Sequence, residues 1–414
     1  VRLTRKGKPV FKLPSLKDFY EDLKERGCLK VVCGKAPYTK ILPVGNKFGL
    51  LSESAGGLGG VLNSSFFIMD SFDVASPYDV IGTAFGLTVK DGQVLNPPLY
   101  KREALLVKKA NDTTPGEVLV ATPLLKELEV EIDGCIFKDG EKGVEFFERP
   151  ERSKTPKLPG KDDVLDLAVI GRKVVAVKAG GGMEIPAAGF VIRINNTENN
   201  SINKNVCGVN ADSCSDNTDF GSVNTDFGSG NTDFGNVNRD FGNVNTDFDR
   251  VNTGGNYLGS PVKYRGLEDV LFAVQCGNSA VIKGEKTLRF KSPFYNIKNP
   301  LEVVYPPTLY PLNYKKARAP RMVAGAARDG SPVFLWIEGK GKFSYEKGVD
   351  SCGASLSEVA DICVKLGLYN AVNLDGGGSA QIVLGGKRCL KISDRNKEDN
   401  SEAERAVPLG IRIK

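Results

Sequence analysis

The residues best suited to chemistry form one short stretch, Asn373–Ala380, with the sequence NLDGGGSA. An apolar run ends here in Asp375 and continues directly into three glycines, Gly376, Gly377 and Gly378. Glycine inside a regular element costs about 0.5–1 kcal/mol relative to alanine, so three in a row need a physical reason. Successive backbone amides without side chains can hold an anion in a tight turn. The stretch therefore predicts an anion-binding turn beside a carboxylate that a strand end aims.

The surroundings of the glycines exclude two familiar phosphate-binding motifs. Strand-like runs, NAVNL and AQIVLGG, lie on both sides of the turn. The Walker loop and the dinucleotide-binding fingerprint both require a helix directly after the glycines. The structural alternative is a cramped β-turn that Asp375 caps and Ser379 holds, without any ligand.

The composition restricts the chemistry further. The 414 residues include no histidine, so Ser-His-Asp and Cys-His catalysis cannot exist within this chain. Acid–base chemistry near neutral pH must then fall to Asp, Glu, Lys, Tyr or Cys. Nine cysteines form no CxxC pair, so we predict no zinc site.

The charge and hydropathy patterns narrow the classes of partner. The net charge of +6 is mild and scattered, which suits an anionic substrate and argues against nucleic acid. No apolar run reaches the roughly 18 residues that a transmembrane helix needs. No signal peptide is visible, so the compartment stays open, with an extracellular or cell-surface location expected if a leader was removed.

The elements that must position the turn form an α+β pattern. We expect mixed, largely antiparallel sheets with a few packed helices, in one catalytic domain that a low-complexity insertion interrupts. Residues 1–58 read as an N-terminal extension with one helix, and residues 59–194 and 258–414 as the two parts of the domain. In the second part, PRMVAGAARDGSPVFLWIEG predicts a hairpin, and SLSEVADICVKLGLY predicts a helix whose capping box is Ser355 with Glu358.

The predicted insertion, residues 195–257, is rich in Asn, Asp and Gly and repeats the pattern N-T-D-F-G-x-V every seven residues. One Phe per repeat beside Gly and Asn is wrong for a coiled coil. We interpret the segment as polar turns in a tolerated low-complexity loop. A stacked β-roll or a calcium-binding array is the alternative, since Asp and Asn supply the oxygen ligands that calcium prefers. No cofactor is predicted with certainty, and a divalent cation such as calcium stays open.

Five blocks of sequence, in order, resemble the phosphodiester glycosidase family. The longest is SLSEVADICVKLGLYNAVNLDGGGSAQIVLGGK, and the others are VLNSSFF, IPAAGFVI, PRMVAGAARDGSPVFLWIEG and ERAVPLGI. The resemblance covers roughly residues 59–194 and 258–414. The chain departs from the family pattern at Ser64 and Ser65, where glycines are usual, at Met322, where a Thr is common, and at Glu338, where an Asp-Gly pair usually stands.

The resemblance implies hydrolysis of the glycosidic bond of a sugar-1-phosphodiester or a phosphorylated glycoconjugate, releasing free sugar and a phosphomonoester. Carboxylates near the anomeric carbon would stabilise the cationic ring that glycoside cleavage creates. The departing phosphate monoester loses its last proton near about pH 6, so little general-acid help is needed. Hydrogen-bond donors around the phosphate matter more.

These considerations assign a role to each candidate site residue. Asp375 and Glu338 are the candidate catalytic carboxylates, one activating water or facing the cationic ring and the other exchanging a proton. The predicted substrate-binding residues are Arg405 and then Arg321 for the phosphate, the amides of Gly376, Gly377 and Gly378 for the same group, Asn63 and Asn373 for the sugar or for orienting a carboxylate, and Ser379 for holding the turn.

Two rival interpretations remain. The first is a non-catalytic glycan- or glycan-phosphate-binding surface protein on the same fold, with the repeats as an adhesive arm. The second is an interaction or structural element of a cell or particle surface, which rests only on the repeats.

Overall fold

The computed structural model describes residues 60–69, 71–109, 117–149, 151–195, 257–277, 279–287, 318–339, 351, 353–396 and 398–413. It also describes Leu50 and the backbone of three strands at 2–3, 31–35 and 41–44. The helix predicted within residues 1–58 and the repeats of residues 195–257, apart from Asn195 and Tyr257, lie outside the described residues. The domain boundaries drawn from the sequence remain predictions.

The molecule is built mainly of strands, so the predicted α+β class with several packed helices is wrong. Within the described residues the structure contains one α-helix, α3 (Leu356–Lys365), and three short 3-10 helices, η2 (Ser71–Asp73), η3 (Leu125–Glu127) and η4 (Gly377–Ser379). The physical reason is the length of the apolar runs. Most are four to seven residues long and end at Gly, Pro or Asp, which is too short for a helix and typical of strands.

The largest sheet has seven strands in the order β1-β2-β20-β19-β21-β17-β18. Their bounds are β1 Arg2–Leu3, β2 Val31–Lys35, β20 Pro332–Ile337, β19 Arg321–Ala327, β21 Leu368–Asn373, β17 Ser279–Ile282 and β18 Glu285–Lys286. A five-stranded sheet beside it has the order β23-β22-β4-β24-β3. Its bounds are β23 Lys387–Arg388, β22 Ile382–Leu384, β4 Gly60–Asn63, β24 Gly410–Ile413 and β3 Ile41–Val44.

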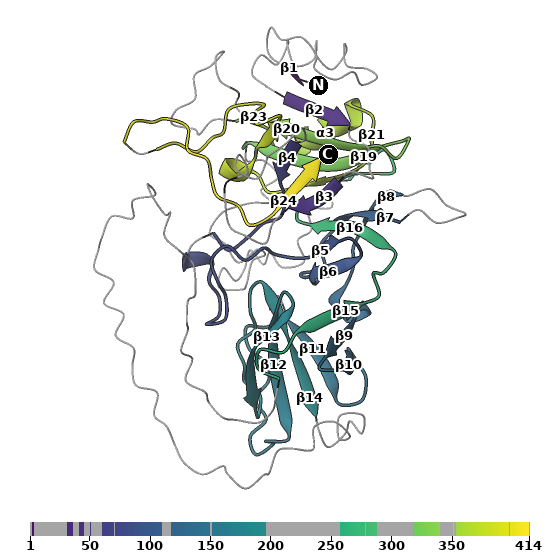
Figure 1. The fold of residues 1–414 in the computed structure, drawn as a ribbon, viewed down its shortest axis with the longest axis vertical. Coiled ribbons are helices and arrows are strands. Elements are labelled where there is room, and N and C mark those ends of the chain that lie inside the picture. The colour runs from purple at the N-terminus through teal and green to yellow at the C-terminus, as the bar shows by residue number, and fades with distance from the viewer. Residues whose placement is uncertain are drawn as a thin grey trace.

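Three further sheets complete the described structure. The first contains β6 (Gln93–Asn96), β5 (Thr88–Lys90), β16 (Val270–Gln275), β7 (Ala104–Lys108) and β8 (Val118–Ala121), in that order. The second contains β11 (Val144–Glu148), β14 (Gly189–Asn195), β12 (Val164–Ile170) and β13 (Lys173–Ala179). The third contains β10 (Cys135–Lys138), β9 (Glu129–Ile132) and β15 (Val262–Arg265). In Figure 1 these last two sheets form the lower end of an elongated molecule, and the seven-stranded sheet with α3 lies at the upper end.

The predicted hairpin and the predicted helix of the second part are both present. β19 and β20 pair antiparallel, and the turn between them closes through the Ala327 amide, which donates to Ser331 O at 2.9 Å. At the start of α3, Ser355 Oγ accepts from the Glu358 amide, and the Glu358 carboxylate accepts in turn from the Ser355 amide. This reciprocal capping satisfies amides that the first helical turn leaves unpaired.

The central strands of the seven-stranded sheet, β20, β19 and β21, are buried on both faces. Alternate residues of its strands, such as Val323 and Leu335, pack with Val359 and Cys363 of α3 in one apolar cluster. The other set, which includes Trp336, Val372 and Leu374, joins the main core of the molecule. A buried side chain of this size contributes about 1.5–3 kcal/mol, so both faces fix the position of β21 and of the turn that follows it.

Strands from before and after residues 195–257 pair with one another. β15 pairs with β9, and β16 pairs with both β5 and β7. β4 likewise pairs with β22 and β24, so residues 59–194 and 258–414 share three sheets. None of the described helices is long and apolar enough to span a membrane.

Candidate functional site

The glycine turn follows β21 directly and is held at several points by backbone hydrogen bonds. The Asp375 amide donates to Ser64 O at 2.9 Å, and the Gly377 amide donates to Pro320 O at 3.0 Å. The Ala380 amide then closes η4 on Gly377 O. The Gly377 amide therefore already has a partner, and the Gly376 amide contacts the Asp375 carboxylate, so Gly378 is the remaining candidate among the three glycines for the predicted anion-holding role.

The local geometry explains why each of the three positions in the turn is a glycine. A methyl group on Gly376 would lie 2.7 Å from Pro320 O, and Gly377 has a left-handed φ of +59°. A methyl group on Gly378 would lie 2.1 Å from Oδ1 and 2.2 Å from Oδ2 of Asp394. The backbone thus passes close to Pro320, just before β19, at Gly376, turns sharply at Gly377, and leaves room for a carboxylate at Gly378.

Asp375 lies beneath this turn and is only 6% exposed. Burial raises the pKa of Asp375 from 3.8 to about 7, because a desolvated carboxylate resists ionisation. The Ser379 hydroxyl, the charge of Arg405 and the Gly376 amide each lower this pKa, and the charge of Asp394 raises it. Asp375 therefore changes its protonation state near neutral pH, which suits an acid–base residue.

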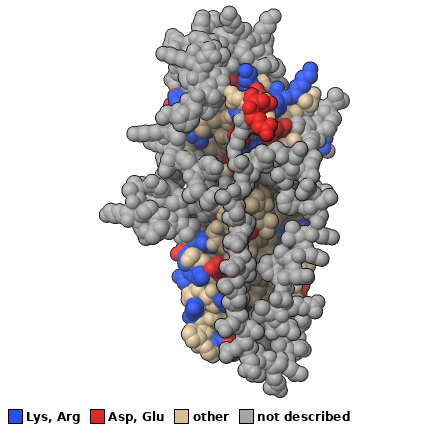
Figure 2. Space-filling view, turned by 90° about the vertical axis from the view of Figure 1, so that its left-hand side faces the viewer, with Lys and Arg blue, Asp and Glu red and all other residues tan. Residues whose placement is uncertain are grey.

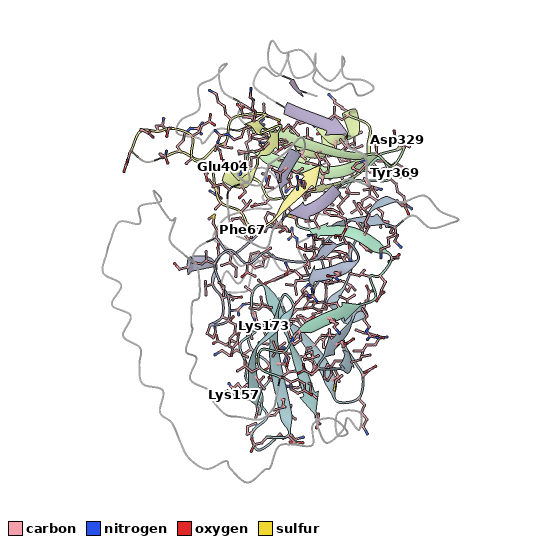
Figure 3. The ribbon with its side chains drawn as sticks, viewed as in Figure 1. Phe67, Lys157, Lys173, Asp329, Tyr369 and Glu404 are labelled. Carbon is pink, nitrogen blue, oxygen red and sulfur yellow. The ribbon has the colours of Figure 1, made fainter. Side chains whose placement is uncertain are left out.

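Arg405 and Asp394 form an ion pair on the accessible side of the turn. Nε and Nη2 of Arg405 both approach Oδ2 of Asp394, at 2.8 and 2.7 Å. Arg405 Nη1 also lies 3.2 Å from the sulfur of Met69. The two charged side chains are 29% and 30% exposed, so solvent and solutes reach this side of the site. In Figure 3, Glu404 and Phe67 mark this region of the molecule.

Asn63, at the end of β4, connects both ends of the turn. Its Nδ2 donates to Asp375 O at 2.7 Å, and its Oδ1 accepts from the Gln381 amide at 3.1 Å. The side chain is 1% exposed. Asn63 thus positions the backbone around Asp375.

Five buried oxygen atoms around the turn have no hydrogen-bond partner of standard geometry within the described part of the chain. They are Ser64 Oγ, Ser65 Oγ, Asn373 Oδ1, Ser379 Oγ and Gln381 Oε1. Ser379 Oγ still faces Asp375 closely enough to lower its pKa. Buried polar atoms normally have partners, so this group of oxygen atoms is a candidate contact surface for a polar ligand. Asn373 also donates its Nδ2 to Leu374 O at 2.9 Å.

Glu338 and Arg321 lie near the glycine turn, and each binds a backbone group of a neighbouring segment. Glu338 Oε2 accepts from the Lys391 amide at 3.0 Å, in the segment that leads to Asp394. Arg321 Nε donates to Ala354 O at 3.0 Å, and burial lowers the pKa of Arg321 to about 10. The charges that shift the pKa of Asp375 are those of Arg405 and Asp394. Asp394 is thus the carboxylate that the structure associates with Asp375.

Sequence reasoning missed several members of the site. Asp394 lies in the polar segment ISDRN, which carries no periodic signal. Cys276, after β16, lies on the inner side, where burial and then the charge of Asp375 raise the pKa of its thiol. Arg102 Nε donates to Cys276 O at 2.9 Å and brings a buried positive charge to the same region. Only the tertiary structure joins these positions.

The described residues contain no group of three His, Cys, Asp or Glu side chains arranged to hold a metal ion. The carboxylates of the site are instead paired with Arg405 or with backbone amides. The calcium-binding array considered for the repeats lies outside the described residues. The chemical groups that the structure does place around Asp375 are its own carboxyl, the guanidinium of Arg405 and buried oxygen atoms.

Comparison with known proteins confirms the resemblance noted in the sequence. Residues 235–414 match the family described as phosphodiester glycosidase. A segment of 87 residues is 33% identical to N-acetylglucosamine-1-phosphodiester alpha-N-acetylglucosaminidase of Bos taurus. That segment covers 21% of this chain and spans only 15% of the length of the bovine protein.

Two solved structures align with most of this chain, each with a TM-score below 0.5. A hypothetical protein from Synechocystis has a TM-score of 0.45 at 15% identity, over 93% of this chain and 59% of its own. The zebrafish N-acetylglucosamine-1-phosphodiester alpha-N-acetylglucosaminidase catalytic domain, auto-inhibited by its pro-peptide, has a TM-score of 0.27 at 12% identity. That alignment covers 92% of this chain and 95% of the zebrafish domain.

Proposed function

Since residues 235–414 match the phosphodiester glycosidase family, we propose that this chain is a hydrolase that cleaves the glycosidic bond of a sugar-1-phosphodiester. Water adds to the anomeric carbon, and the bond from that carbon to the phosphate oxygen breaks. The products are free sugar and a phosphomonoester, and one proton is released to solvent or to a carboxylate. The substrate is a phosphorylated glycoconjugate or another sugar-1-phosphodiester.

The observation that carries this proposal is the environment of Asp375. Its carboxyl is buried, its pKa is about 7, and Arg405 stands on the accessible side of the same turn. We assign the ionised form of Asp375 the role of accepting a proton from the attacking water. The same negative charge would stabilise the cationic ring in the transition state.

The phosphate would bind on the Arg405 side of the turn. A guanidinium offers paired donors that match two phosphate oxygens, and the departing phosphomonoester needs donors more than a proton. At Gly378 the bare backbone lets a negatively charged group approach closely, as the Asp394 carboxylate does. Arg321 and Glu338 take supporting roles in this proposal, because each already binds a neighbouring segment.

The sugar would bind over the five buried oxygen atoms around the glycine turn, those of Ser64, Ser65, Asn373, Ser379 and Gln381. Hydroxyl groups of a sugar can donate to Ser64, Ser65 and Asn373, which have no standard partner within the described residues. Each such bond removes the penalty of an unpaired buried polar atom, roughly 1–3 kcal/mol. These side chains thus favour a polyhydroxylated ligand over an apolar one.

The test is incubation of the protein with a panel of sugar-1-phosphodiesters, with and without chelator, scored for free reducing sugar and for new phosphomonoester. We expect turnover by the unchanged protein and none by Asp375→Asn. Asp269→Asn, at an exposed ion pair with Lys108, is the matched control and should keep full activity. Equal turnover by Asp375→Asn and the unchanged protein would remove Asp375 from the mechanism, and binding without turnover throughout would favour a non-catalytic glycan-phosphate-binding protein.

A further inference from the structure

We propose that Asp394 is a specificity-determining residue that admits phosphodiesters and disfavours phosphomonoesters, because its carboxylate shares Arg405 and the face of Gly378 with the bound phosphate. This inference rests on the proposed function, since it names the charge class of ligand that the same site accepts. It assigns a role to a residue that the sequence patterns did not single out.

The first observation is the position of the Asp394 carboxylate. Oδ2 receives both Nε and Nη2 of Arg405, which is the paired edge that a phosphate would otherwise occupy. Both carboxylate oxygens lie so close to Gly378 that a methyl group there would overlap them. A negatively charged group is therefore already present at the two elements predicted to hold the anion.

The second observation is that the main chain of Asp394 is held independently of Arg405. Asp394 O accepts from the Ala403 amide at 3.1 Å and from Arg395 Nη1 at 2.8 Å. Arg395 and Glu402 form an antiparallel bridge beside it. Because these contacts do not involve Arg405, Asp394 stays next to the site when Arg405 turns part of its donor set to a phosphate.

The third observation is the balance of charge. One guanidinium, Arg405, already faces one carboxylate, Asp394, so the pair carries no net charge. The segment that contains both residues projects from the left of Figure 1, and acidic and basic side chains lie next to one another in the upper part of the face that Figure 2 shows. The pair itself therefore offers no net positive charge that would favour a doubly charged ligand.

The consequence follows from the chemistry of the two phosphate classes. A phosphodiester carries one negative charge, whereas a phosphomonoester carries two above about pH 6. The second charge of a monoester would lie beside the Asp394 carboxylate and be repelled by it. The substrate would thus be accepted and the product of the proposed reaction released.

The test uses two small ligands without a sugar, so that it does not depend on turnover. Phenyl phosphate is a dianion and methyl phenyl phosphate a monoanion at pH 7.5, and phosphorus NMR titration measures the binding of each. For Asp394→Asn we expect affinity for the dianion to rise about tenfold or more, equivalent to about 1.4 kcal/mol, with a much smaller change for the monoanion. Glu402→Gln, in the same segment, is the matched control and should change neither affinity.

Two outcomes would overturn the inference. An equal gain for both ligands would mean that Asp394 only competes for Arg405, and no gain for either would mean that it does not face the anion. Asp394→Ser replaces Asp394→Asn if the latter does not fold. Charge selection without hydrolysis of any sugar-1-phosphodiester would instead reject the proposed function and leave the inference standing.

Discussion

Replacing Asp375 with Asn should make the protein more stable above neutral pH while it abolishes the proposed activity. The folded protein holds the Asp375 proton up to about pH 7, whereas the unfolded chain releases it near 3.8. Between these values the folded state binds more protons than the unfolded state, so stability falls as pH rises. Asn cannot ionise, so the stability of Asp375→Asn does not fall with pH for this reason.

The magnitude follows from the pKa values. The difference is about three pH units, and each unit corresponds to about 1.36 kcal/mol, so the cost approaches about 4 kcal/mol at pH 8. At pH 5 only the interval from 3.8 to 5 contributes, which is about 1.6 kcal/mol. The stability advantage of Asp375→Asn should thus grow by about 2–3 kcal/mol between pH 5 and pH 8.

The assay is urea unfolding at several pH values, followed by the fluorescence of Trp336. This is the single tryptophan of the chain, and it is fully buried in the seven-stranded sheet. Asp269→Asn at an exposed ion pair is the control and should show no growing advantage. A constant difference between Asp375→Asn and the unchanged protein across this pH range would refute the raised pKa and, with it, the assignment of Asp375 as the acid–base residue.

Two further predictions test the electrostatics and packing around the site, and a third tests the buried ion pair between β12 and β14. The value of kcat/KM should rise with pH through about 7 as Asp375 ionises. Arg405→Gln should move this rise to higher pH, because the positive charge of Arg405 lowers the pKa of Asp375. A pH profile that does not move would contradict the electrostatic interaction between Arg405 and Asp375. Gly378→Ala should destabilise the protein by roughly 1–3 kcal/mol because the methyl group overlaps Asp394, and adding Asp394→Ala should restore stability in thermal unfolding, whereas simple additivity of the two changes would argue against the overlap. Asp166→Ala should lower the free energy of unfolding in urea by about 3–5 kcal/mol, because it leaves the buried Arg193 without its carboxylate partner. A loss below about 1 kcal/mol would show that water replaces the carboxylate as the partner of Arg193.

Features with a local cause could be predicted from the sequence. The capping box of α3 depends on Ser355 and Glu358, which are three residues apart. The β19–β20 hairpin depends on the turn residues between its strands. The position of Asp375 at the end of a buried strand follows from the apolar run before it and the glycines after it. In each case nearby residues decide the conformation, so a short pattern is sufficient.

Features that depend on distant contacts could not be predicted in this way. The predicted α+β class is wrong, because the strands that dominate the described structure pair over long sequence distances, whereas only one of its segments forms an α-helix. Asp394 has no local signal, and its role arises from the side chain of Arg405 and the bare face of Gly378. Asn63 was expected to contact sugar or orient a carboxylate, yet both polar groups of its side chain bind backbone groups of the turn.

The hydrogen bond from Asn63 to Asp375 O joins residues that are 312 positions apart. In the same sheet β24 lies between β4 and β3, so a strand synthesised late must insert between two that were synthesised early. Contacts between such distant segments form slowly, because a long loop must close first. During synthesis on the ribosome, β3 and β4 would therefore stay unpaired with β24 until the end of the chain is made. The site around Asp375 would be completed only in the final stage of folding.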